Sequence, residues 1–317
     1  MKTIAVKSKS TKKLYFIIFS MIIIGAIIPL FVSSYVSAML MLVFMNVIMA
    51  ESYNIIGGFT GYPTFGHGVN FGIGAYITAL LLRDFGFSPL ITFPLAGLIA
   101  ALFSFGVGFP ILRARGIYFA MVTVSLNWVI ALIITLTPYT GGPTGIIIPY
   151  ALRIEILNRI GYAFYYALCI ITIFISYKIS RSKLGYGLFA IKEDEDACRL
   201  LGVPTTKLKL YSYAISSFFA GAVGGLYPFF FGYIDPTVVF ATTLSITPIA
   251  AAYLGGIGTI FGPVLGAVII TLLAENLRYL FTVYEGLHML VTYIITLIIL
   301  LYRREGILGG FRKIRER

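Results

Sequence analysis

Long apolar stretches, separated by short polar or glycine-rich connections, run through most of the chain. Many of them approach the ~20 residues that a helix needs to cross a ~30 Å hydrocarbon layer. A membrane β-barrel would instead show segments of ~10 residues with alternating polarity, and the sequence has none. The pattern predicts an all-α bundle of about ten membrane spans, one of them short: 14–33, 35–56, 68–82, 89–111, 116–137, 160–179, 209–231, 244–254, 263–283 and 286–302.

The first apolar stretch follows a lysine-rich segment and has two interpretations. Lysines before an apolar run are typical of a secretory signal peptide, and Val36-Ser37-Ala38 weakly resembles a cleavage site. The apolar run is longer than the core of an ordinary signal peptide. We therefore favour an uncleaved first span over 14–33.

Composition supports a membrane protein. The chain is 59% hydrophobic and 11% charged, whereas an ordinary soluble domain has roughly 25% charged residues. The net charge of +12 raises the possibility of nucleic-acid binding. Because the basic residues cluster beside apolar stretches, we interpret them as a topology signal and expect a lipid bilayer, and no nucleic acid, as the partner.

The basic residues also predict the orientation. If ten spans alternate across the bilayer, all lysines and arginines fall on one side except Arg83, Arg153, Arg159 and Arg278. The positive-inside rule makes that side the cytoplasm, so a multi-pass protein of the cytoplasmic membrane with both termini inside is expected.

Three regions follow from this topology. We expect a basic cytoplasmic N-terminal tail over 1–13, a transmembrane domain over 14–302 and a basic cytoplasmic C-terminal tail over 303–317. The transmembrane domain contains a cytoplasmic loop at about 181–208.

Two glycine-rich stretches, 57–68 and 255–263, interrupt the apolar pattern. They are either broken helices at membrane depth, which transporters use around their pathways, or tight turns with glycines that allow close helix packing. Similar small-residue helices follow both stretches, which suggests a duplicated unit. For His67, a hydrogen-bonded structural role is favoured over a substrate or proton site. The candidate pathway residues are Gly57, Gly61, His67, Asn70, Asn127, Gly255, Gly256 and Gly258.

Few residues in the sequence could carry chemistry. No His, Cys, Asp and Glu residues have metal-ligand spacing, and no phosphate-binding loop occurs. We therefore expect no metal, no catalytic residue and no cofactor on this chain, so another polypeptide must bind any ATP that is used. Glu275 and Arg278 lie on one helical face and can pair, but the spans show no row of carboxylates for a proton relay.

The predicted cytoplasmic loop contains a short helix. Four consecutive acids, 193–196, suit the N-terminus of a helix, Gly202 suits its C-terminus and Pro204 ends it. A helix of two turns is only marginally stable alone, so it must be held by other structure. It either packs on its own bundle or docks into a groove on a cytoplasmic partner, and composition favours neither.

Several motifs, taken together, resemble the LivM-type permeases of ABC importers for branched-chain amino acids. They recur in the family's order: NIIGGFTG at 54–61, FGHGVNFGIGAY at 65–76, RARGIYFAMVT at 113–123, TGGPTG at 140–145, IKEDEDA at 191–197, GYIDP at 232–236 and LGGIGTIFGPVLG at 254–266. The sequence departs from the family at Asn127-Trp128, where members often have Gly-Glu, and at Thr144, where an Asp is frequent.

The resemblance implies a type II-like ABC importer permease. Its partners would be a second permease of LivH type, two cytoplasmic ABC ATPases that bind the ATP, and an external substrate-binding protein. The resemblance also assigns the loop as the element that couples to the ATPase, through Gly185, Glu193, Asp194, Glu195, Asp196, Ala197, Leu200, Leu201 and Gly202.

The expected function is therefore import of branched-chain or other hydrophobic amino acids, driven by ATP hydrolysis on other subunits. Related permeases carry urea or short amides, so that cargo is an alternative. An ion-coupled carrier or channel that acts alone is a second alternative. A membrane enzyme would need paired carboxylates or a metal cluster, and neither is evident.

Overall fold

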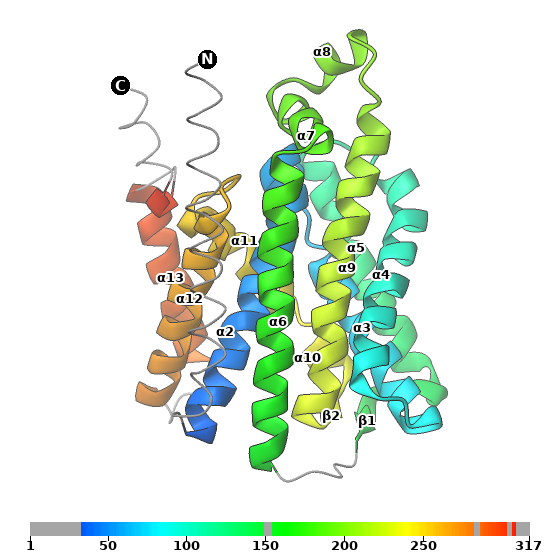
Figure 1. Cartoon of the computed structure of the whole chain (residues 1–317), viewed down its shortest axis with the longest axis vertical. Coiled ribbons are helices and arrows are strands. Elements are labelled where there is room, and N and C mark those ends of the chain that lie inside the picture. The colour runs from blue at the N-terminus through cyan, green and yellow to red at the C-terminus, as the bar shows by residue number, and fades with distance from the viewer. Residues whose placement is uncertain (1–32, 149–153, 282–285, 303–305, 309–317) are drawn as a thin grey trace, which may run out of the picture.

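The chain forms an almost entirely helical bundle (Figure 1). The computed structural model describes residues 33–148, 154–281, 286–302 and 306–308. Its helices are α2 (Ser34–Tyr53), α3 (His67–Phe85), α4 (Pro89–Ile111), α5 (Ile117–Leu136), α6 (Ile154–Ser180), α7 (Lys183–Glu193), α8 (Glu195–Leu200), α9 (Thr205–Phe231), α10 (Pro236–Val239), α11 (Thr243–Gly255), α12 (Phe261–Leu280) and α13 (Leu287–Tyr302). A π-helical turn η1 (Asn54–Gly58) extends α2, and two 3₁₀ turns follow α5: η2 (Pro138–Thr140) and η3 (Gly142–Thr144).

The prediction of an all-α polytopic membrane protein is confirmed. Within the described ranges, seven segments are long and apolar enough to cross a membrane: Ser34–Gly58, Pro89–Ile111, Ile117–Leu136, Arg159–Ser180, Thr205–Phe231, Pro236–Gly255 and Phe261–Leu280. Two further predicted spans correspond to α3 and α13. The count of ten stays a prediction, because the predicted span over 14–32 lies outside the described residues. So do the predicted N-terminal tail and, except for 306–308, the predicted C-terminal tail.

Small residues allow the central helices to approach closely. The helix α9 packs against α3 and α4, and it also contacts α2, α6 and α7. A Cβ atom on Gly74 of α3 would lie 2.0 Å from the carbonyl oxygen of Gly221 in α9, and a Cβ on Gly224 would lie 2.1 Å from that of Phe71. Such contacts are typical of helix packing in membranes, where van der Waals fit replaces the hydrophobic effect.

A second group of helices lies beside this centre. α11 packs against α12, both contact α2, and α13 contacts α11 and α12. Because α2 also packs against α6 and α9, it joins the two groups.

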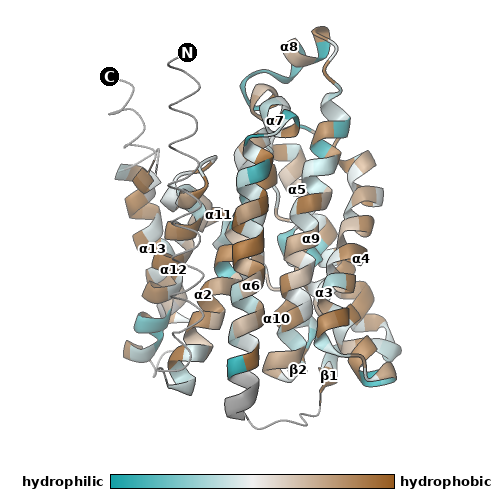
Figure 2. Cartoon of the chain, viewed as in Figure 1, coloured by the Kyte–Doolittle hydropathy of each residue, from teal (hydrophilic) through white to brown (hydrophobic). Residues whose placement is uncertain are grey.

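The two ends of the bundle differ. At one end, α8 projects beyond the other described helices, with α7 below it (Figure 1). At the opposite end, β1 (Ile146–Ile147) pairs antiparallel with β2 (Tyr233–Ile234) (Figure 1). Apolar residues dominate the middle of the helices, while hydrophilic residues gather near α7 and α8 (Figure 2). The loop predicted at 181–208 is therefore the polar end of the bundle.

Candidate functional site

The two glycine-rich stretches, far apart in sequence, meet in the structure. Asn54 links them, since its side-chain amide donates to the carbonyl of Thr259 at 2.7 Å and its Oδ1 accepts from the backbone N–H of Gly258 at 2.8 Å. A Cβ atom on Gly58 would lie 3.1 Å from the backbone nitrogen of Gly258. Asn54 thus satisfies one carbonyl and one N–H group of the second stretch within the protein, and whether the stretches lie at membrane depth stays a prediction.

Lys192, at the end of α7, reaches this junction. Its ammonium donates to the carbonyl oxygen of Gly58 at 2.9 Å. Gly61 adopts φ +73°, and a Cβ there would lie 3.2 Å from Cγ of Lys192. The polar end of the bundle is therefore in direct contact with the π-helical turn that extends α2.

The other predicted pathway residues hold helices together. His67 Nε2 lies 3.0 Å from the hydroxyl of Ser216, and Asn70 donates to the hydroxyl of Ser217 at 2.8 Å. Asn127 donates to the carbonyl of Phe240 at 2.8 Å. These three side chains are at most 3% exposed, so the structure places them in helix contacts, and their part in a pathway stays a prediction.

The remaining candidate glycines also lie at close backbone approaches. Gly57 packs on the ring of Tyr53, and a Cβ on Gly255 would lie 1.6 Å from the carbonyl oxygen of Gly262. Gly256 adopts φ +124°, a conformation that other residues rarely reach.

The short helix predicted within 185–204 is α8, and its ends follow the sequence. Asp194 is the N-cap, because its Oδ1 accepts from the backbone N–H groups of Asp196 and Ala197, each at 2.9 Å. Gly202 follows the helix with φ +79°, as a C-terminal glycine should. Leu200, the last residue of α8, and Leu201, its C-cap, are 89% and 83% exposed, so these two leucines face away from the bundle.

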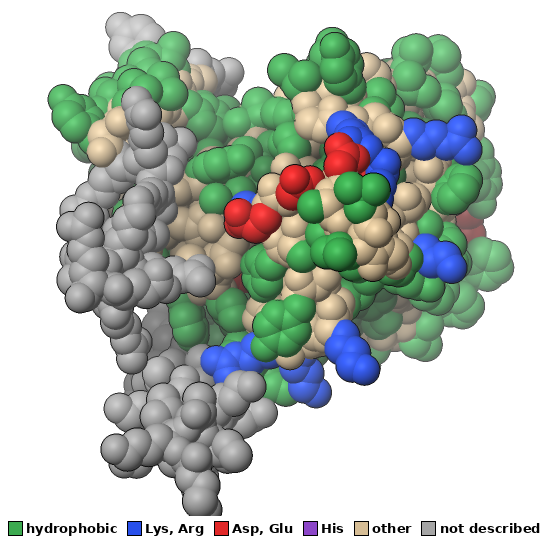
Figure 3. Space-filling view, turned by 90° about the horizontal axis from the view of Figure 1, so that it is seen from above, with side chains coloured by type: hydrophobic (Ala, Val, Ile, Leu, Met, Phe, Trp, Pro, Cys, Tyr) green, Lys and Arg blue, Asp and Glu red, His purple; other side chains and the backbone are tan. Residues whose placement is uncertain are grey.

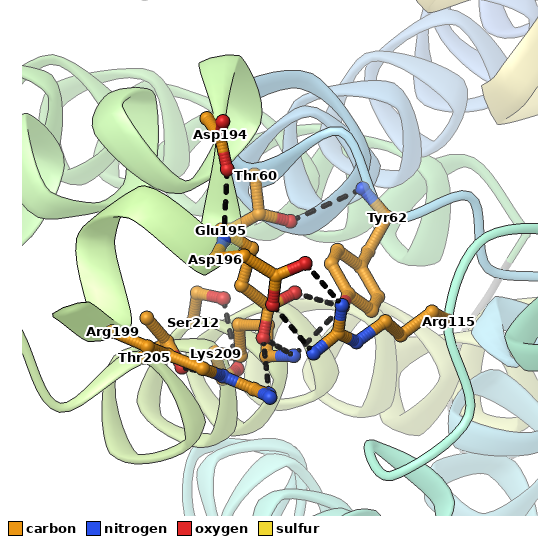
Figure 4. Close-up of polar contacts among 10 residues, drawn as sticks. All are labelled: Thr60, Tyr62, Arg115, Asp194, Glu195, Asp196, Arg199, Thr205, Lys209 and Ser212. Atoms are coloured by element: carbon orange, nitrogen blue, oxygen red, sulfur yellow. Dashed lines mark hydrogen bonds and ion pairs between the residues drawn. The ribbon is translucent and has the colours of Figure 1, made fainter.

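An ion-pair cluster attaches α8 to the bundle (Figure 4). Lys209 of α9, whose side chain is 0% exposed, lies 2.7 Å from the Glu195 carboxylate and donates to the Tyr62 hydroxyl at 2.8 Å. The Tyr62 hydroxyl in turn donates to Glu195, and the Lys209 ammonium lies 4.2 Å from the centre of the Tyr62 ring. A buried charge is tolerated when it is paired and hydrogen-bonded in this way.

Two arginines complete this cluster. Arg115, between α4 and α5, makes a bidentate pair with Asp196 at 2.9 Å for both bonds, and Arg199 pairs with Glu195 at 2.6 Å. Burial raises the pKa of Glu195, but the hydrogen bonds from Lys209 and Tyr62 outweigh burial and hold this pKa below its usual value. The hydrogen bonds from Arg115 lower the pKa of Asp196. Both carboxylates are therefore ionised at neutral pH.

The sequence left open whether the short helix packs on its own bundle or docks on a partner, and the structure shows the first of these contacts. α8 is held by its own bundle, through Glu195, Asp196 and the buried Cys198. Acidic and basic side chains adjoin at this end of the molecule, with apolar side chains beside them (Figure 3). The exposed leucines are not used in that attachment, so they stay available for a partner.

The sequence did not identify Tyr62, Arg115 or Lys209 as contacts of this loop, and it assigned no role to Cys198 within it. A signal was present for Lys209, since it is a cation placed just inside an otherwise apolar span. No group of three or more potential metal ligands occurs in the part of the chain that the structure describes.

Comparison with known proteins identifies the family. Residues 35–300 match the family model "Branched-chain amino acid transport system / permease component". The LivM permease of Salmonella typhimurium is 30% identical over 298 residues, which is 85% of this chain and 70% of the relative, and LivM of Escherichia coli is 29% identical over 303 residues, 86% and 71% of the two chains. The LivH permease of Salmonella typhimurium is 27% identical over 290 residues, 83% of this chain and 90% of the relative.

No solved structure matches the chain. The relatives are transport permeases of the membrane and not enzymes. The family model covers most of the chain, and the structure is a bundle of apolar helices long enough to cross a membrane. The chain therefore belongs to the family of permease components of branched-chain amino acid transport systems.

Proposed function

We propose that this permease imports branched-chain or other hydrophobic amino acids across the cytoplasmic membrane as one subunit of an ATP-driven importer. Its relatives are named high-affinity branched-chain amino acid transport permeases of two kinds, LivM and LivH, which supports pairing with a second permease. Two cytoplasmic ATPases would bind the ATP, and an external binding protein would deliver the cargo.

One observation carries the coupling part of this proposal. α8 is fixed to the bundle by a buried ion pair, yet it presents Leu200 and Leu201 almost fully to solvent. A short helix that is rigid on one side and apolar on the other suits docking into a hydrophobic groove. The positive-inside rule places this end in the cytoplasm, where the ATPases are.

The geometry also supports a route for the movement. A force on α8 would reach α9 through the Glu195–Lys209 pair, the segment before α3 through Tyr62, and the start of α5 through Arg115. Lys192 adds a contact between the end of α7 and the break at Gly58. ATP-driven closure of the ATPases would thereby move the helices on either side of both breaks.

The test uses the complete importer in proteoliposomes. Leu200→Asp with Leu201→Asp should prevent co-purification of the ATPases and abolish ATP-driven leucine uptake, because a charge would be buried in the docking groove. The matched control, Leu200→Met with Leu201→Met, keeps an apolar surface of similar volume and should retain both properties.

Full coupling in the aspartate variant would contradict the docking role of α8. Uptake by this chain alone, driven by an ion gradient without ATP, would instead support a secondary carrier.

A further inference from the structure

A cavity of about 810 Å³ lies between α2, α10, α11, α12 and α13. Its lining residues come from the start of α11 and the end of α12, so it is remote from the glycine-rich stretch 255–263 that joins these two helices. This volume is within the roughly 300–1,000 Å³ that small-molecule sites usually have. The cavity is open on one side. None of the pathway residues predicted from the sequence lines it, so it is a separate feature of the bundle.

Its wall combines apolar and polar surface. Leu42, Leu244 and Ile270 contribute apolar side chains. Asn46 donates to the hydroxyl of Thr271 at 3.0 Å, and the hydroxyls of Thr247 and Tyr293 lie 2.8 Å apart. These two bonds join α2 to α12 and α11 to α13, so the wall is held in place before any ligand arrives.

One carboxylate and one guanidinium also line the cavity. Glu275 and Arg278 lie three residues apart on α12, and their charged groups are 3.7 Å apart, which is an ion pair beyond ordinary hydrogen-bond length. The Glu275 side chain is 22% exposed and that of Arg278 is 67% exposed. Both residues lie in the last two turns of α12, so the charged part of the cavity wall is at one end of this helix.

The Glu275–Arg278 pair lies at the end of the bundle opposite α8. α12 begins next to the break that touches Lys192, and Glu275 and Arg278 occupy its other end. They therefore lie away from α8, towards the face on which a binding protein would release cargo if α8 is cytoplasmic (Figure 1).

We propose that this cavity binds a zwitterionic amino acid with an apolar side chain. Glu275 accepts hydrogen bonds from the ammonium, Arg278 donates to the carboxylate, and the side chain lies against Leu42, Leu244 and Ile270. The proposal rests on the proposed function and extends it by assigning a cargo site on this chain.

The chemistry of the pair supports a zwitterion over other solutes. A lone carboxylate would select a cation and a lone guanidinium an anion, whereas adjacent opposite charges fit a ligand that carries both. An exposed pair of this length contributes little to stability, so a ligand that replaces the contact between the two charges costs the protein little stability. Urea or a short amide would leave the two charges without matching partners.

Cysteine protection tests the site directly. In the complete importer in nanodiscs without ATP, Val238→Cys places a thiol in the cavity wall at a position that is 42% exposed. The two natural cysteines of this chain are buried, so labelling of the importer without Val238→Cys gives the background to be subtracted. Leucine should slow maleimide labelling at least fivefold, while isocaproate, which lacks the ammonium, and leucinamide, which lacks the carboxylate, should not.

Substitutions then test whether Glu275 and Arg278 are each required for leucine binding. Glu275→Gln and Arg278→Gln, each combined with Val238→Cys, should abolish protection by leucine while the subunits still co-purify. Arg83→Gln is the matched control, because Arg83 forms an exposed pair with Asp84 at the end of α3 and does not line the cavity. That variant should keep full protection.

Failure of this site can be distinguished from failure of the proposed function. If the importer takes up leucine with ATP but leucine gives no protection, or if isocaproate and leucinamide protect equally well, the cargo site is wrong and the function stands. Protection unchanged in Glu275→Gln and Arg278→Gln would also overturn it. If no branched-chain amino acid is taken up with ATP, the proposed function itself is refuted.

Discussion

Replacing Lys209 by Met should release α8 from the bundle. The Lys209 ammonium is fully buried, lies 2.7 Å from Glu195 and 2.8 Å from the Tyr62 hydroxyl, and is paired with a carboxylate that is only 9% exposed. Removing one partner of a buried pair costs ~3–5 kcal/mol, because the other charge stays buried without compensation. Arg199 still pairs with Glu195 at 2.6 Å, so we expect a loss of about 2–3 kcal/mol.

Hydrogen exchange measures this loss. A change of 2–3 kcal/mol in the free energy of local opening corresponds to a fall of roughly 30- to 150-fold in the protection of the backbone amides of 195–201. The ratio of leucine imported to ATP hydrolysed should fall with it. Lys207→Met is the matched control, since Lys207 is an exposed lysine on the same helix.

The double variant Lys209→Met with Glu195→Gln sharpens the test. Removing both charges leaves no uncompensated carboxylate, so protection should recover for the most part. Unchanged protection in the single variant, or the same loss in the Lys207 control, would refute the reasoning that this ion pair holds α8.

Two other predictions concern the breaks and the cluster. Gly255→Ala should destabilise the protein by ~1–3 kcal/mol and lower the midpoint of thermal unfolding in detergent, because its Cβ would meet the backbone of Gly262. Gly106→Ala is the control, since no atom lies within 4 Å of its Cβ, and it should leave the midpoint unchanged. An equal loss in both variants would contradict the argument. Because the pKa of Glu195 and that of Asp196 lie below their unfolded values, their contribution to holding α8 is present above the ordinary carboxyl pKa and is lost as pH falls through the lowered values. Amide protection of 195–201, corrected for intrinsic exchange, should therefore stay constant from neutral pH to about pH 5 and decline below about pH 4, whereas a decline already near neutrality would show that other groups control it.

Much of the helical layout follows from local pattern. The predicted span 89–111 coincides with α4, and 244–254 lies within α11. The ends of α8 were also predictable, because an acidic N-cap and a glycine after the last turn act within a few residues. α9 begins at Thr205, four residues before its prediction, since hydropathy does not register the polar first turn of a helix that continues out of the membrane.

The contacts of the site were not predictable in the same way. Glu195 meets Tyr62 across a separation of 133 residues, and Asn54 meets Thr259 across 205. The periodicity of a single sequence does not predict such long-range contacts, because they depend on how the helices pack. For the same reason the sequence did not show which side of α8 is buried, and the contact made by Cys198 was not predicted.

The position of the cluster along the chain has a consequence for biogenesis. Tyr62, Arg115, Glu195 and Lys209 all precede α11, whereas the junction of the two breaks requires Gly258. Because a chain emerges from the ribosome with its N-terminal part first, α8 can be secured while the last helices are still being synthesised. The end of the bundle that carries α8 would then be assembled before the two glycine-rich stretches meet, so a nascent permease can hold α8 in place before its own interior is closed.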